Sequence, residues 1–184
     1  MVKSIIQKEK KMEKTDRYED APQEVLNILG EVRDKYFPHL VNAHIKMLLD
    51  NKKRVSQKKL LLGKIIKPND LVKHFVDNDT HYVIVLDKVG TEILSPEDKI
   101  RLIRHELRHA FIDEKGNYIV IPHDYEDFEE EIKLNAEDVG WAHRAVTMVS
   151  DVYAQREEQA KEAKRKPGGK RGRPRKNPAK IFEG

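Results

Sequence analysis

The hydrophobic positions in the first quarter of the chain follow a helical period. Between residues 22 and 37 they recur every three or four positions, which predicts an amphipathic helix. Gly30 and Pro38 weaken or interrupt this pattern, and the apolar positions between 40 and 49 resume it. The N-terminal part is therefore expected to form two helices or one kinked helix.

Strand-like runs follow this helical part. Residues 60–66 are mostly apolar and predict a strand, after which Asn69 can cap a short helix that reaches Phe75. Residues 82–86 form a continuous apolar run rich in β-branched side chains, which is typical of a buried strand. A further short strand is expected at 118–121.

The clearest helix start in the sequence is Ser95-Pro96-Glu97-Asp98. It combines an N-cap serine, a proline at the first helical position and an acidic residue three positions after the cap. A helix over about 96–113 is predicted, with His105 and His109 on the side opposite to its core face. The residues expected on that core face are Ile100, Ile103, Leu107, Ala110 and Phe111.

Together these elements predict an α+β fold. We expect N-terminal helices, a small mixed sheet from about 58–67, 82–87 and 118–121, the helix of 96–113 packed beneath it, and C-terminal helices. The strand at 82–87 is expected at the rim of a cleft, where an extended substrate can add to a sheet edge. No internal repeat is visible in the sequence.

Composition divides the chain further. Hydrophobic residues make up 38% and charged residues 37% of the 184 positions, so part of the length is expected to carry charge outside a core. We predict a charged leader over 1–20, one domain over 21–150, a helical extension or linker over 151–163 and a disordered basic tail over 164–184.

The composition and the hydropathy pattern also exclude several classes of protein. No apolar run approaches the ~20 residues of a membrane span, and the N-terminus lacks the apolar region of a signal peptide. A cytoplasmic protein is therefore expected. Because the chain has no cysteine, disulfides, cysteine-ligated zinc fingers, iron–sulfur clusters and cysteine nucleophiles are excluded.

Charge is distributed unevenly along the chain. The net charge is +4, but residues 164–184 alone hold nine Lys or Arg against Glu183. The rest of the chain is consequently net negative, and no basic face is expected on the domain. Residues 124–138 hold eight acidic side chains against Lys133, a concentration that repels polyanions.

The candidate chemistry lies at His105-Glu106-Leu107-Arg108-His109, an H-E-x-x-H sequence on a predicted helix. Histidines four positions apart stack one turn apart, so both imidazoles can bind one Zn²⁺. Glu106 is then placed to take a proton from a zinc-bound water, whose pKa the metal lowers to ~7, and to return it to the leaving amine. The motif predicts a metallopeptidase with one zinc per chain.

A third ligand is needed, because a catalytic zinc commonly has three protein ligands and one open position. His123 is the preferred candidate, since it follows the strand of 118–121 that brings the chain back past the helix. Glu126, Asp127 and Glu130 are the alternatives, and any of them would make a two-histidine, one-carboxylate site.

Together with other segments, the H-E-x-x-H helix makes the chain resemble the putative phage metallopeptidases, a group similar to the SprT/Spartan-like minimal zincins. The resemblance covers about residues 22–145 and is carried by Phe37–Ile45, the strand ending at Lys67, Tyr82–Leu86, His105–His109 and Pro122–Phe128. It implies a small zincin-like domain, metal-dependent peptide hydrolysis and His123 as the third ligand. It also suggests a phage- or prophage-encoded protein in a bacterial host and, from the Spartan-like members, proteolysis of DNA-bound proteins.

The basic tail resembles an AT-hook at Arg171-Gly172-Arg173-Pro174. Glycine lets the backbone lie against the floor of a narrow groove, proline keeps the chain extended, and the two arginines can enter A·T-rich minor grooves. Lys170, Arg175 and Lys176 are expected to contact phosphates. The tail thus predicts association with A·T-rich double-stranded DNA or the nucleoid.

These observations favour a zinc metallopeptidase directed to DNA or DNA-bound proteins. The alternative is a DNA-associated regulatory or inhibitory binding protein with a non-catalytic zincin fold. A metal-dependent nuclease fits less well, because one glutamate beside a single zinc lacks the paired carboxylates of two-metal sites. The sequence does not predict the cleaved bond or the oligomeric state.

Overall fold

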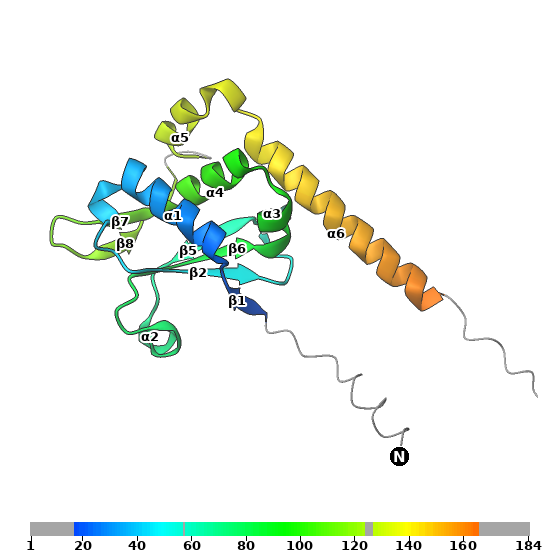
Figure 1. The fold of residues 1–184 in the computed structure, drawn as a ribbon, viewed down its shortest axis with the longest axis horizontal. Coiled ribbons are helices and arrows are strands. Elements are labelled where there is room, and N and C mark those ends of the chain that lie inside the picture. Colours follow the sequence, from blue (N-terminus) through cyan, green and yellow to red (C-terminus); the bar gives the residue numbers. More distant parts are fainter. Residues whose placement is uncertain (1–16, 57, 124–126, 166–184) are drawn as a thin grey trace, which may run out of the picture.

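The computed structural model describes residues 17–56, 58–123 and 127–165, which form an α+β domain around a four-stranded sheet (Figure 1). The elements are β1 (Tyr18–Asp20), α1 (Gln23–Tyr36), η1 (Pro38–Leu40), β2 (Ile45–Asp50), β3 (Val55–Ser56), β4 (Lys59–Leu60), β5 (Gly63–Ile66), α2 (Asp70–Val76), β6 (Tyr82–Asp87), α3 (Lys88–Ile93), α4 (Pro96–Arg108), β7 (Ala110–Ile112), β8 (Tyr118–Val120), α5 (Glu129–Leu134), η2 (Ala136–Asp138) and α6 (Trp141–Arg165). The α+β class with a small sheet, predicted from the sequence, is confirmed.

The sheet has the order β1-β2-β6-β5, with β2 parallel to β6 and the two outer strands antiparallel to their neighbours. Every residue of β6 is buried, as its continuous apolar sequence predicted. The prediction that this strand lies at the rim is wrong, because β2 and β5 flank it on both sides. The outer strand next to the cleft is β5.

Residues 45–50 were expected to be helical and instead form β2. Their register with β6 runs from Ile45 opposite Tyr82 to Asp50 opposite Asp87. A short apolar run suits a helix and a strand equally well, and here pairing with a distant strand decides between them. Pro38 ends the preceding helix, whereas Gly30 lies inside an uninterrupted α1.

Helix α4 begins as predicted, with the Ser95 hydroxyl accepting a hydrogen bond from the backbone N–H of Asp98 (3.1 Å). It ends at Arg108, short of the predicted residue 113, because Ala110–Ile112 pairs with Tyr118–Val120 in a separate two-stranded hairpin. The strand expected at 118–121 is thus present but lies outside the main sheet. Phe111, predicted on the core face, is 45% exposed in this hairpin.

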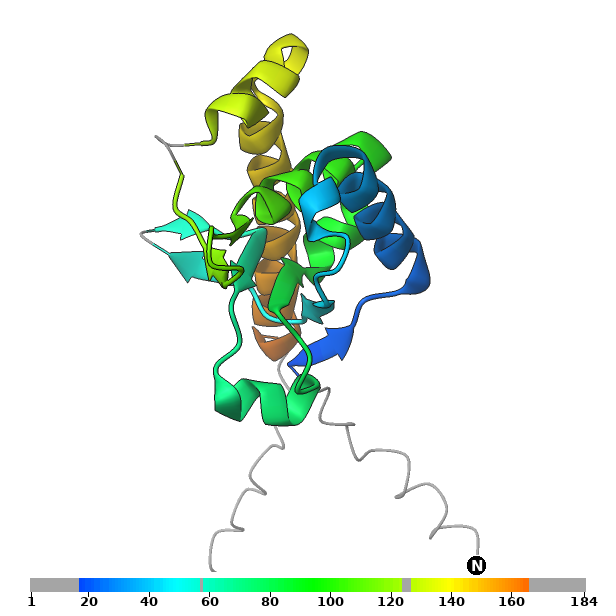
Figure 2. The same ribbon diagram turned by 90° about the vertical axis from the view of Figure 1, so that its left-hand side faces the viewer.

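The buried core lies between one face of the sheet and helices α1, α4 and α6 (Figures 1 and 2). Ile103 and Leu107 on α4 are fully buried there, as is Val149 on α6. The α6 helix is also fixed to the sheet by its Tyr153 hydroxyl, which donates to Asp87 Oδ2 (2.8 Å).

None of the helices in the described ranges is long and apolar enough to cross a membrane. The expected leader over 1–20 lies mostly outside the described residues, and so does the expected basic tail from residue 166 onward.

Candidate metal centre

The last turn of α4 brings the first two histidines together. His105 lies within the helix and His109 is its C-cap residue, and their ring centroids are 5.4 Å apart. The amphipathic character of α4 explains their direction, since Ile103 and Leu107 occupy the core face. Both imidazoles therefore reach the cleft side of the helix.

The third histidine arrives from the segment that follows β8. The backbone N–H of Ile121 donates to the carbonyl oxygen of His109 (2.9 Å), which holds this segment against the end of α4. The ring of His123 then lies 4.9 Å from that of His105 and 4.5 Å from that of His109. One nitrogen of each ring lies within 4.8 Å of the others, as in a three-histidine metal site.

Contacts behind the rings orient the two helix histidines. His105 Nδ1 lies 3.0 Å from Asp127 Oδ1, and His109 Nδ1 lies 2.6 Å from the carbonyl oxygen of Ile121. With Nδ1 engaged in this way, Nε2 of each ring is directed to the centre, where His105 Nε2 and His123 Nε2 are 3.0 Å apart. This donor set fits a divalent ion such as Zn²⁺.

The surroundings of these rings shift their pKa values in opposite directions. Burial lowers the pKa of His105, but the hydrogen bond that its ring donates to Asp127 and the charge of Glu106 outweigh this effect, so the net shift is upward. For His109 burial dominates, and its pKa is lowered. The carboxylate of Asp127 therefore favours a positive charge at His105, whether from a proton or from a metal.

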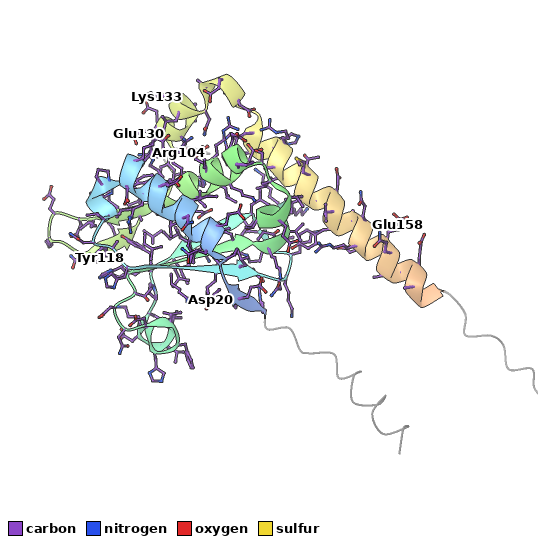
Figure 3. The ribbon with its side chains drawn as sticks, viewed as in Figure 1. Asp20, Arg104, Tyr118, Glu130, Lys133 and Glu158 are labelled. Carbon is purple, nitrogen blue, oxygen red and sulfur yellow. The ribbon has the colours of Figure 1, made fainter. Side chains whose placement is uncertain are left out.

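The acidic alternatives for the third ligand occupy other positions. Asp127 lies behind His105, whereas Glu130 lies on α5 (Figure 3) and pairs with Arg108. Glu126 lies outside the described residues. Among the described residues, His123 is the only one of these candidates that joins the cluster.

Glu106 projects toward β5. Its side chain is 5% exposed, and the backbone N–H of Ile65 donates to its carboxylate. Burial raises the pKa of Glu106 to about 7. A Cβ added at Gly63 would lie 2.8 Å from Glu106 Cδ and closer still to Oε1, so only glycine leaves room for this carboxylate.

Two features of the site were not foreseen from the sequence. Phe128 is buried and its ring contacts all three imidazoles, with centroid distances of 5.9, 4.8 and 5.0 Å to His105, His109 and His123. Glu131 is fully buried and accepts hydrogen bonds from Arg104 (2.8 Å) and Arg108 (3.2 Å) on α4. The sequence signal that could have indicated a buried acidic partner is the spacing of Arg104 and Arg108, which lie one turn apart on the helix.

The site opens into a cavity of about 720 Å³ between β5 and α4. Its walls include, beside the three histidines and Glu106, the side chains of Leu60, Leu62, Leu102, Trp141 and Val146. The sequence also offers the phenols of Tyr118 and Tyr125 as hydrogen-bond donors to a developing oxyanion. Tyr118 stacks on His81 (centroid distance 3.8 Å) and is not among the residues that line the cavity (Figure 3). The other, Tyr125, lies outside the described residues.

The loop that carries His123 is braced by the sheet. The Tyr82 hydroxyl on β6 is 2.7 Å from the carbonyl oxygen of Phe111 and 3.0 Å from that of Ile119, so it holds both strands of the β7–β8 hairpin.

The residues assigned to DNA binding in the tail, 170–176, lie outside the described residues.

The chain matches a known family. The model of a family described as putative phage metallopeptidase matches residues 16–155, a range that includes all three histidines and Glu106. No significant match was found among curated proteins or among solved structures.

Proposed function

The chain belongs to the putative phage metallopeptidase family, and from this premise we propose that it is a zinc-dependent peptidase with Glu106 as its general base. The observation that supports this best is the convergence of three imidazoles, from α4 and from the segment after β8, beside a buried glutamate in an open cleft. His105, His109 and His123 are the proposed ligands of one Zn²⁺ per chain.

Each protein group has a distinct part in the proposed reaction. Zinc, when bound, supplies a Lewis acid that polarises the scissile carbonyl and lowers the pKa of a water molecule. Glu106 takes the proton of the attacking water and passes it to the leaving amine. Its raised pKa, about 7, suits a group that must both accept and release a proton near neutral pH.

The edge of β5 is the proposed site for the substrate backbone. Because Asp87 N–H donates to Leu62 O (2.7 Å) and bonded pairs alternate in an antiparallel ladder, Gly63 and Ile65 direct their N–H and C=O groups away from β6. Apart from the N–H of Ile65, which donates to Glu106, these groups border the cleft, where an extended peptide can pair with them. The rim strand expected from the sequence is thereby replaced by β5.

We further propose that the tail directs the enzyme to DNA. Residues 170–176 include the Arg171-Gly172-Arg173-Pro174 segment, whose composition suits an A·T-rich minor groove. The natural substrates would then be DNA-bound proteins in the cytoplasm or nucleoid of a bacterial host. The support for this part is the sequence of the tail alone.

Metal content is the first test. Wild type, His105→Ala and His123→Ala are compared by inductively coupled plasma mass spectrometry, with His143→Ala as control, because His143 is exposed on α6. We expect one zinc per chain in wild type and control, and loss in both site variants. Zinc lost only in His105→Ala would reassign the third ligand.

Activity is tested separately from metal binding. Glu106→Gln is expected to keep its zinc but to abolish cleavage of a casein or peptide substrate, because an amide cannot accept the proton of the attacking water. Persistent turnover would contradict the role of Glu106. Absence of zinc in the reconstituted wild type would favour a DNA-associated binding protein.

A further inference from the structure

The described part of the chain contains a concentrated cationic segment. Between Asp50 and Asp70 there are seven Lys or Arg residues and no acidic one. They are Lys52, Lys53, Arg54, Lys58, Lys59, Lys64 and Lys67. The part of the chain outside the tail is net negative, but this segment is an exception to that average, and the expectation of a domain without a basic face does not hold for it.

The segment forms the hairpin of β3 and β4 and continues into β5. Figure 2 shows this small hairpin projecting from the sheet on the side of the molecule away from α1. Arg54 fixes its base, since its guanidinium lies 3.2 Å from Asp50 Oδ2 and donates to the carbonyl oxygen of Val85 (2.8 Å). The hairpin is thus held to the sheet, with Lys52 and Lys58 exposed and Lys59 at the edge of the cleft.

Most of these cations are not neutralised within the molecule. Lys52, Lys58, Lys59 and Lys64 are exposed, and none of them is in an ion pair with another residue of the described ranges. Two of the seven are paired: Lys53 Nζ lies 3.6 Å from Glu157 on α6, and Arg54 pairs with Asp50. The hairpin therefore presents a positive surface that attracts a polyanion.

The same contact relates the hairpin to the basic tail. Lys53 lies beside Glu157 and over the ring of Tyr153 (5.6 Å), so the base of the hairpin adjoins the second half of α6. The helix continues to Arg165, a further rise of about 12 Å. The chain thus enters the tail sequence about 12 Å along the helix from the contact with the hairpin.

The opposite wall of the cleft has the reverse charge. Asp127 lines the cleft, and Glu129 and Glu130 are exposed at the start of α5. A polyanion lying across the cleft would be repelled there, and so would an acidic peptide bound along it. The charges favour a polyanion on the outer side of the hairpin, with the cleft left open.

We propose that the β3–β4 hairpin binds the phosphate backbone of double-stranded DNA without regard to sequence. The hairpin and the tail then both bind the same duplex, and the cleft faces proteins bound to that duplex. The choice of DNA as the polyanion rests on the proposed function of the tail. The cations of the hairpin themselves fit any regular array of phosphates.

The test measures the salt dependence of DNA binding by the full-length protein. Fluorescence anisotropy with labelled 20-base-pair duplexes, one A·T-rich and one G·C-rich, compares wild type with Lys52→Gln/Lys58→Gln. The control is Lys35→Gln/Lys115→Gln, which removes two exposed charges from α1 and from the β7–β8 turn. Zinc content is measured for every variant.

Loss of two phosphate contacts should make the slope of log K against log salt less negative by about 2 and weaken binding roughly tenfold on both duplexes. The control should leave both values unchanged. An unchanged slope in the hairpin variant overturns the proposal. So does a rise in KM for acidic peptides without any change in DNA binding, which would identify an acidic peptide as the ligand.

Failure of the hairpin is distinguishable from failure of the tail. Arg171→Gln/Arg173→Gln should reduce the preference for the A·T-rich duplex. In this background, Lys52→Gln/Lys58→Gln should still weaken binding to the G·C-rich duplex. If only the tail variant alters DNA binding, the hairpin proposal is wrong and the tail proposal stands. Zinc content and peptidase activity report on the metal site independently of both.

Discussion

Asp127 Oδ1 lies 3.0 Å from His105 Nδ1, on the side of the imidazole away from the three-histidine centre. A carboxylate in this position fixes the tautomer and the direction of a ligand histidine and raises the basicity of its other nitrogen. The sequence offered Asp127 as a direct ligand. The structure gives it an outer position, from which it acts through His105.

The first prediction concerns this carboxylate. Asp127→Asn should lower the affinity for zinc about 10- to 100-fold, because the amide neither carries the negative charge nor fixes the ring as strongly. Competition with a chromophoric zinc chelator measures the affinity. Glu129→Gln, an exposed change on the same acidic segment, is the matched control and should leave the affinity unchanged. Equal affinities for wild type and Asp127→Asn would refute the orienting role.

The second prediction concerns the anchor of α5. Glu131 is buried between Arg104 and Arg108, so Glu131→Gln leaves two guanidinium groups without their shared counter-charge. The free energy of unfolding should fall by roughly 3–5 kcal/mol, as for other broken buried pairs. Urea denaturation measures it. Lys133→Gln breaks only the exposed pair with Glu129 and should cost less than about 1 kcal/mol.

The centre of the site was predictable because its signals are local. The H-E-x-x-H spacing, the Ser95 cap and the helical period together place His105 and His109 on one face of α4. His123 followed from its position after an expected strand, and the strand is present. These inferences depend on chain geometry over a few turns, which the sequence specifies directly.

The errors concern contacts between distant segments. The strand at Ile45–Asp50 is set by its pairing with β6, and the early end of α4 is set by the pairing of β7 with β8. The packing of Phe128 on the imidazoles likewise depends on where α5 docks. No local pattern encodes these partners, because each apolar run could pair with several others.

The third prediction concerns pH. Burial raises the pKa of Glu106 from 4.5 to about 7, so the uncharged form is favoured in the folded protein. Its contribution to the free energy of unfolding is complete below the unfolded pKa and is lost as pH rises through about 7. The metal-free protein should therefore lose about 3 kcal/mol from this group between pH 5 and pH 8.

Urea denaturation in the presence of a chelator measures this loss. Glu106→Gln carries no titratable group at this position, so its unfolding free energy should fall less over the same pH range than that of wild type. Because both proteins share the other titrating groups, the difference between the two pH profiles isolates Glu106. Parallel profiles would show that folding does not raise the pKa of Glu106.

The last prediction concerns Gly63, which borders Glu106 from β5. In Gly63→Ala the new methyl group overlaps the carboxylate and forces it to move, because the nearest Glu106 atoms would lie within 2.9 Å. A displacement of about 1 Å at a proton-transferring group can lower kcat roughly 100-fold. Zinc content should stay at the wild-type level, since the three atoms nearest to the added Cβ all belong to Glu106 and none to a histidine.

Gly30→Ala is the matched control for this substitution. No atom lies within 4 Å of the added Cβ at Gly30, which is inside α1, so the methyl group meets no obstacle. Alanine should stabilise the helix by about 0.5–1 kcal/mol and leave kcat unchanged. Comparison of Gly63→Ala with Gly30→Ala thus separates the general effect of an added methyl group from the effect of placing it beside Glu106. Wild-type kcat in Gly63→Ala would mean that the carboxylate acts from a position other than the one beside β5.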